Sequence, residues 1–134
     1  MYGKLLMLGV LALGGALAHP LTGAALSVPG GRYAQLDAAT LKRQLASKDF
    51  ILVNVHTPYQ GEIAGTDRFV PFDLVTRDGR LPKNKNAEIV VYCRSGRMSE
   101  VAARALVKLG YTDVRELRGG MNAWAAAGLA LKGR

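Results

Sequence analysis

The sequence predicts an α/β domain built on a mainly parallel β-sheet, and three observations favour this fold class. Two short runs, FILVNV at residues 50–55 and EIVVYC at 88–93, are rich in β-branched residues and apolar on both faces, as covered parallel strands are. Helical patterns separate the strand candidates, and this alternation indicates a parallel sheet flanked by helices. The chain has 134 residues, a length typical of one domain.

The first strand and helix of this domain are predicted within residues 33–49, YAQLDAATLKRQLASKD. Asp37 is expected to cap the helix, because its carboxylate can accept a hydrogen bond from a free amide of the first turn. Leu41 and Leu45 stand four residues apart, which gives the helix an apolar stripe for packing.

Two weaker strand candidates complete the predicted sheet, RFVPF at residues 68–72 and DVREL at 113–117. Pro71 has no amide hydrogen to give to a neighbouring strand. We therefore expect the first of these candidates at the edge of the sheet or at a strand end.

Two further helices are predicted after the strand at 88–93. The stretch SEVAARALVKLG at 99–110 is amphipathic, and Gly110 is a natural stop for it. One face carries the charged residues Glu100, Arg104 and Lys108, and the opposite face carries Ala102, Ala105, Leu106 and Leu109. The stretch MNAWAAAG at 121–128 predicts an Ala-rich helix, with Trp124 expected in the core.

The N-terminus has the pattern of a secretory signal. Lys4 precedes the uncharged apolar run Leu5–Ala18, which ends in an A-x-A cleavage pattern. We expect residues 1–18 to be a signal peptide, with an uncleaved membrane anchor as the alternative. Residues 19–31 then read as a linker, and residues 32–134 as the domain. The domain is expected to be exported, into the periplasm if the source is bacterial, or held at the membrane by this N-terminal segment.

The charge and the cysteine count limit the function classes. Lys and Arg number 18 against 10 Asp and Glu, a net charge of +8. Such a charge is typical of proteins that bind nucleic acid, anionic lipid or small anionic substrates, and the alternative is a surface that is only generally basic. No basic block or basic stretch interleaved with aromatic residues favours nucleic acid. A single cysteine excludes an internal disulfide, and with only His19 and His56 beside it the chain lacks a metal-ligand set. We expect neither a metal nor a cofactor.

The lone cysteine, Cys93, stands where a parallel sheet binds ligands, beyond the carboxyl end of a strand. The next five residues, RSGRM, are too few and too polar for another strand and must turn the chain into the following helix. Gly96 permits such a turn, and the amides at the helix start form an anion-binding cradle. Helix N-termini and nearby arginines, here Arg94 and Arg97, favour a reactive thiolate. The alternative is an inert cysteine buried in the core.

Three stretches of the sequence resemble the rhodanese-like sulfurtransferases. The stretch YCRSGRMS is similar to their active-site loop, and NVHTPYQGEIAGT to their early strand and the loop that follows. The stretch LGYTDVRELRGGMNAWAAAGLAL matches their C-terminal Gly-Tyr, Leu-x-Gly-Gly and Trp-x-x-Ala-Gly pattern. The resemblance covers about residues 33–131, with the three stretches in the family's order.

This resemblance implies a three-layer fold, with a five-stranded parallel sheet flanked by helices. It also implies that Cys93 is the catalytic nucleophile, which takes the outer sulfur of thiosulfate or of a persulfide or polysulfide and becomes a persulfide. A thiol, an acceptor protein or cyanide would then remove the sulfur. The backbone amides that would stabilise the sulfur anions belong to the substrate-binding loop, which consists of Arg94, Ser95, Gly96, Arg97, Met98 and Ser99.

The length of the loop separates this family from its relatives in the same fold. Sulfurtransferase loops count six residues from the cysteine, as Cys93 to Met98 do. The phosphatase and arsenate-reductase relatives have one more residue and then an arginine, where this chain has Ser99. Arsenate reduction generally also needs a second, resolving cysteine, which this chain lacks.

The sequence departs from the family pattern at the end of the strand at 50–55. Asn54-Val55-His56 replaces the usual Asp-x-Arg, and Glu62 stands where the family has histidine. His56 is expected near the pocket rim, where it either orients a substrate or only satisfies local hydrogen bonds. These departures leave open a second hypothesis, that of a non-catalytic persulfide carrier or redox-sensing module that binds a partner protein.

Overall fold

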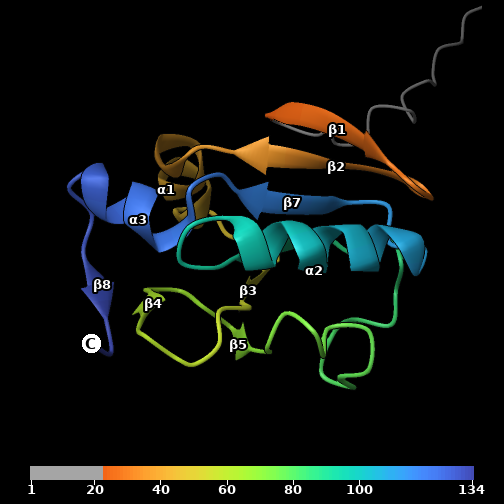
Figure 1. Cartoon of the computed structure of the whole chain (residues 1–134). Coiled ribbons are helices and arrows are strands. Elements are labelled where there is room, and N and C mark those ends of the chain that lie inside the picture. The colour runs from red at the N-terminus through yellow and green to blue at the C-terminus, as the bar shows by residue number, and fades with distance from the viewer. Residues whose placement is uncertain (1–22) are drawn as a thin grey trace, which may run out of the picture.

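The computed structural model describes residues 23–134, and a six-stranded sheet with helices on both faces dominates it (Figure 1). The strand order is β1-β2-β7-β6-β3-β5. A second, two-stranded antiparallel sheet pairs β4 with β8. The strands are β1 Ala24–Val28, β2 Gly31–Leu36, β3 Ile51–Asn54, β4 Glu62–Ile63, β5 Arg68–Phe69, β6 Ile89–Tyr92, β7 Val114–Leu117 and β8 Leu131–Lys132. The helices are α1 Ala38–Leu45, α2 Arg97–Lys108 and α3 Gly120–Ala126.

Five of the six strands, from β2 to β5 in the sheet order, run parallel, which confirms the predicted α/β class. The weak candidate at 68–72 forms β5 at the sheet edge, as Pro71 indicated. The weak candidate at 113–117 forms β7, which is central and fully buried.

The sixth strand, β1, was not predicted. Residues 24–28 fall within the expected linker at 19–31, but they pair antiparallel with β2 in an unbroken register from Ala24 opposite Gln35 to Val28 opposite Gly31. A two-residue turn at Pro29 and Gly30 makes this hairpin possible, since Gly30 has a φ of 92°. The sheet therefore begins before residue 32. The expected signal segment at 1–18 lies outside the described residues.

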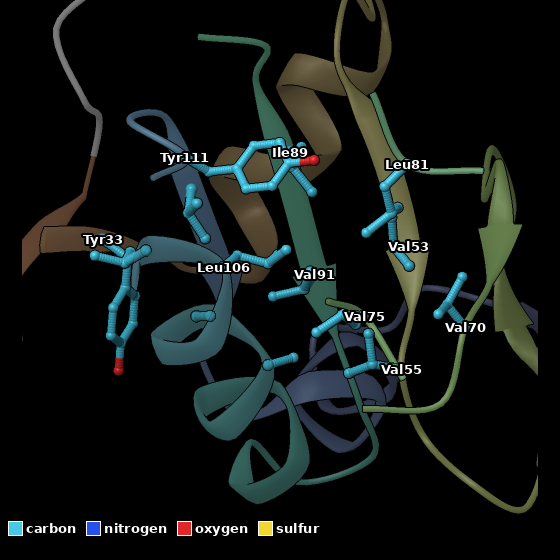
Figure 2. Close-up of a cluster of buried hydrophobic side chains, with 14 of the residues drawn as sticks. Tyr33, Val53, Val55, Val70, Val75, Leu81, Ile89, Val91, Leu106 and Tyr111 are labelled. Carbon is cyan, nitrogen blue, oxygen red and sulfur yellow. The ribbon is translucent and has the colours of Figure 1, made fainter. Parts of the chain in front are cut away.

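The two faces of the sheet bury different side chains because successive residues of a strand point in opposite directions. On one face, Leu106 of α2 packs beside Ile89 and Val91, and Val53 belongs to the same cluster (Figure 2). On the other face, α1 and α3 pack on Leu52, Val90 and residues nearby, and Trp124 lies in this second cluster as predicted. The alternation along β6 places residue 93 on the face that α2 covers.

The helix boundaries follow the predicted caps with one exception. Asp37 caps α1 by accepting a hydrogen bond of 2.8 Å from the Thr40 amide. Helix α2 begins at Arg97, two residues before the predicted start, because Gly96 serves as its N-cap. Within residues 23–134 no helix combines the length and the apolar character needed to cross a bilayer.

Candidate active site

Cys93 lies at the carboxyl end of β6, where its side chain is only 1% exposed. The preceding residue, Tyr92, points to the opposite face of the sheet. Its hydroxyl accepts a hydrogen bond from the Ile63 amide at 3.0 Å and lies 2.7 Å from Thr66 Oγ1. Burial raises the pKa of Tyr92 to about 12, so this hydroxyl stays protonated and holds the strand end in place.

The chain after Cys93 turns so that an amide of the loop faces the sulfur. The Gly96 amide donates to Cys93 Sγ at 3.0 Å. Gly96 adopts a left-handed conformation with a φ of 115° and gives α2 no side-chain cap. The first-turn amides of an α-helix have no acceptor within the helix, and they carry the positive end of its dipole. The sulfur atom therefore lies at the N-terminus of α2, where negative charge is favoured.

The start of α3 fixes the backbone of the loop from the other side. The Met121 amide donates to the Cys93 carbonyl and the Asn122 amide to the Arg94 carbonyl, both at 2.9 Å. This close approach requires Gly120, which has a φ of 57°. A Cβ at this position would overlap the carbonyl oxygen of Cys93 and lie 2.8 Å from the carbonyl carbon of Arg94. The Leu-x-Gly-Gly stretch thus positions the cysteine loop.

A chain of polar side chains lies beneath the loop. Ser99 Oγ is 3.4 Å from Cys93 Sγ, donates to Glu116 Oε2 at 2.6 Å and lies 3.2 Å from the Gly96 carbonyl. Glu116 belongs to β7 and is fully buried, and Gln35 of β2 donates to its other oxygen at 3.0 Å. Burial raises the pKa of the Glu116 carboxyl above its ordinary value of 4.5, although the hydrogen bonds from Ser99 and Gln35 oppose this shift.

The rim of the site contains an open pocket of about 470 Å³. Arg94 lines it, and its guanidinium donates to Gln60 Oε1 at 3.1 Å. The same oxygen lies 3.2 Å from His56 Nε2, so His56 meets Arg94 through Gln60 rather than directly. Two arginines give the pocket a positive character; its lining residues are Tyr59, Gln60, Arg94, Gly133 and Arg134.

The predicted residues of the substrate-binding loop differ in how exposed they are. Arg94, Ser95 and Arg97 are exposed, so solvent and a ligand can reach their side chains. Met98 is partly buried and packs against the core cluster on the α2 face. Gly96 and Ser99 are buried beside the sulfur.

Two further site residues, Gln60 and Glu116, were not predicted from the sequence. Gln60 occupies a polar loop without a distinguishing pattern. Glu116 carried a usable signal, because it stands between the apolar residues Val114 and Leu117 of a predicted strand, and a carboxylate buried in a strand must find a partner.

Asn54, which stands where the resemblance implies aspartate, is fully buried and uses both ends of its amide. Its Nδ2 donates to the Gly61 carbonyl and its Oδ1 accepts from the His56 amide, each at 3.0 Å. The side chain ties the end of β3 to the loop that leads to Gln60.

Replacement of Asn54 by aspartate is expected to destabilise the fold by about 1–3 kcal/mol, although aspartate is the residue that the resemblance implies at this position. A carboxylate oxygen would then face the Gly61 carbonyl, where the amide now donates. The loss should be larger at neutral than at acidic pH, since a protonated carboxyl at this position could again donate. Urea denaturation at two pH values measures this effect, and equal stability of both proteins at neutral pH would contradict it.

Comparisons with known proteins agree on one family. A family model described as a rhodanese-like domain matches residues 37–127. A protein named sulfurtransferase from Allochromatium vinosum is 36% identical over 101 residues, which are 72% of this chain and 92% of that protein. The solution structure of a rhodanese-like domain from Anabaena sp. is 32% identical with a TM-score of 0.63, covering 75% of this chain and 79% of that one. The chain also matches 21% of the length of a Mycobacterium tuberculosis protein named "Probable adenylyltransferase/sulfurtransferase MoeZ", with 31% identity over 60% of this chain.

Proposed function

The chain belongs to the rhodanese-like domain family, whose relatives here include named sulfurtransferases, and from this premise we propose that it transfers sulfane sulfur through a persulfide on Cys93. The donor is thiosulfate or a persulfide or polysulfide, and the acceptor is a thiol or cyanide. The observation that carries the proposal is the position of Cys93 Sγ at the N-terminus of α2, with the Gly96 amide 3.0 Å away.

The burial of the sulfur atom supports a small donor. Cys93 is 1% exposed, so a bulky reactant cannot reach it, whereas the terminal sulfur of thiosulfate or of a polysulfide is a single atom. Once this atom is bound to Cys93, it stands farther out and becomes accessible to a larger acceptor. Geometry therefore favours a sequence in which a small donor acts first and a thiol acts second.

The proposed reaction has two displacement steps. In the first, the Cys93 thiolate attacks the outer sulfur of thiosulfate, a new S–S bond forms, and the old S–S bond breaks with its electron pair leaving on sulfite. In the second, the acceptor attacks that same outer sulfur, and the electron pair of the bond returns to Cys93. The loop amides stabilise the negative charge on sulfur in both steps.

Replacement of Arg94 by glutamine is expected to raise the KM for thiosulfate about three- to tenfold, because it removes a positive charge from the pocket rim. Replacement of Arg43 by glutamine is the matched control, since Arg43 is on α1, on the opposite face of the sheet from α2. Initial rates at several thiosulfate concentrations measure the effect. If both variants change the KM equally, the rim does not bind the donor.

The proposed function is tested by steady-state kinetics with thiosulfate and a thiol acceptor. A covalent persulfide intermediate predicts parallel lines in a double-reciprocal plot, with many turnovers per protein. If the protein takes up sulfur once and releases it only to a particular protein, it is the carrier of the second hypothesis. Converging lines would contradict a persulfide intermediate.

A further inference from the structure

The buried carboxyl of Glu116 lies two hydrogen bonds away from the sulfur of Cys93. Ser99 Oγ joins the two, at 2.6 Å from Glu116 Oε2 and 3.4 Å from Cys93 Sγ. The 2.6 Å contact is in the range of a hydroxyl bonded to a charged oxygen. A hydroxyl both donates and accepts, so Ser99 can pass a proton in either direction between the two acidic groups.

The sheet register holds Glu116 in this place. Glu116 stands opposite Gln35 on β2 and opposite Val91 on β6, and Val91 lies two residues before Cys93 on the same face. Gln35 occupies Glu116 Oε1, so Oε2 is the oxygen that faces Ser99. A Cβ at Gly96 would lie 3.7 Å from Glu116 Oε2, so the carboxyl is directly beneath the loop.

The charged and titratable neighbours of Glu116 come from several elements. Glu100 of α2 and Tyr33 of β2 add negative or potentially negative groups, while Arg118, just after β7, adds a positive one. Burial and the Glu100 carboxylate favour a neutral Glu116, whereas the hydrogen bonds from Ser99 and Gln35 and the charge of Arg118 favour its ionised form. Burial has the largest effect of these, and the pKa of the carboxyl is raised above its ordinary value.

We propose that Glu116 accepts the proton of the Cys93 thiol through Ser99, so that the two acidic groups share one proton and one negative charge. The S–H bond of Cys93 breaks and its electron pair stays on sulfur. The proton passes to Ser99 Oγ while the Ser99 hydroxyl proton passes to Glu116 Oε2. The net charge of the site is unchanged, and no proton is released to solvent.

This role makes Glu116 a positioning residue that acts through Ser99. In the thiolate form, the protonated carboxyl donates to Ser99, and the Ser99 hydroxyl is then free to donate to sulfur. In the thiol form, Ser99 donates to the ionised carboxylate instead. The consequence for turnover rests on the proposed function, but the ionisation of Cys93 itself does not.

The test follows the ionisation of Cys93 without any sulfur donor. Cys93 is the only cysteine of the chain, so the rate of alkylation by iodoacetamide against pH reports this thiol alone. If Cys93 and Glu116 share one proton, the alkylation rate of the wild type should rise in two steps as the pH rises. Full ionisation of Cys93 then requires a second negative charge in the site, beside the one that the two groups already share. The upper step is the ionisation of the pair to two anions.

In Glu116→Gln the alkylation rate is expected to rise with pH in a single step. This step should be complete at a lower pH than the upper step of the wild type. Glutamine mimics the protonated carboxyl, can donate to Ser99 and cannot repel the thiolate. Alkylation at pH values below the wild-type upper step should rise by on the order of tenfold at most. Glu100→Gln is the matched control, because Glu100 Oε2 lies 3.9 Å from a Cβ at Gly96 but makes no hydrogen bond to Ser99 within the described residues. It should keep the two steps.

Ser99→Ala is an independent variant that keeps the Glu116 carboxyl but removes the hydroxyl that connects it to Cys93. The thiolate then loses a hydrogen-bond donor, so alkylation at neutral pH should fall about three- to tenfold, opposite to the effect of Glu116→Gln. Near-ultraviolet circular dichroism checks that each variant is folded. The proposal is overturned if wild type, Glu116→Gln and Glu100→Gln share one profile, or if Glu116→Gln slows alkylation as Ser99→Ala does. A protein with the predicted profiles but no sulfur transfer would overturn the proposed function alone.

Discussion

Replacement of Cys93 by serine is expected to reduce sulfur transfer by roughly a thousandfold or more, to the rate of the uncatalysed reaction. A serine hydroxyl stays protonated at neutral pH, and it cannot form the S–S bond on which the proposed cycle depends. The substitution preserves size closely, so the core around position 93 should stay packed. Initial rates with thiosulfate and cyanide measure the loss.

The control for this variant is its stability. Serine can still accept from the Gly96 amide and lie beside Ser99, so its urea midpoint should remain near that of the wild type. Turnover within tenfold of the wild type in a folded variant would show that Cys93 is not the nucleophile. An unfolded variant would be replaced by Cys93→Ala, for which the same loss is expected.

Replacement of Gly120 by alanine is expected to destabilise the protein by about 3–5 kcal/mol and to lower turnover in whatever remains folded. The new methyl group would overlap the Cys93 carbonyl and press on the Arg94 backbone. The two amide contacts that α3 makes with these carbonyls would then lengthen, and the sulfur would shift relative to the α2 amides. Small domains have about 5–15 kcal/mol of stability, so this is a large share of it.

Gly128→Ala is the control that measures the cost of backbone strain without the cost of atomic overlap. Gly128 also has a positive φ, of 81°, but no atom lies within 4 Å of a Cβ built there. It should lose only about 1–2 kcal/mol, the strain of a left-handed conformation, and keep its turnover. Thermal or urea unfolding measures both variants. If Gly120→Ala and Gly128→Ala lower the free energy of unfolding equally, the close approach of α3 to the loop does not contribute to stability.

The fold was largely predictable because its strands carry strong patterns. The runs that form β3 and β6 are apolar on both faces, which only a covered parallel strand requires. Strand β1 was not predicted because its short run, AALSV, lacks a regular alternation of apolar and polar residues, and the Pro-Gly turn after it is equally typical of a linker. The start of α2 was placed two residues late because Gly96, rather than a side-chain cap, begins this helix.

The candidate site was predictable where one short segment forms it and unpredictable where distant segments meet. The sequence contains Cys93 and the loop residues in one continuous run, so their proximity follows from the chain itself. Glu116 reaches the loop only through the register of β7 beside β6, and Gln60 reaches Arg94 only through the fold of the loop after β3. Such contacts depend on strand pairing, which a single sequence does not specify.

Intact-mass spectrometry after brief exposure to thiosulfate shows whether Cys93 carries the transferred sulfur. The wild type is expected to gain one adduct of about 32 Da, the mass of one sulfur atom, and to lose it when cyanide or a thiol is added. Cys93→Ser should gain none. A wild type that stays unmodified, or an adduct of the same mass on Cys93→Ser, would show that Cys93 does not carry the sulfur.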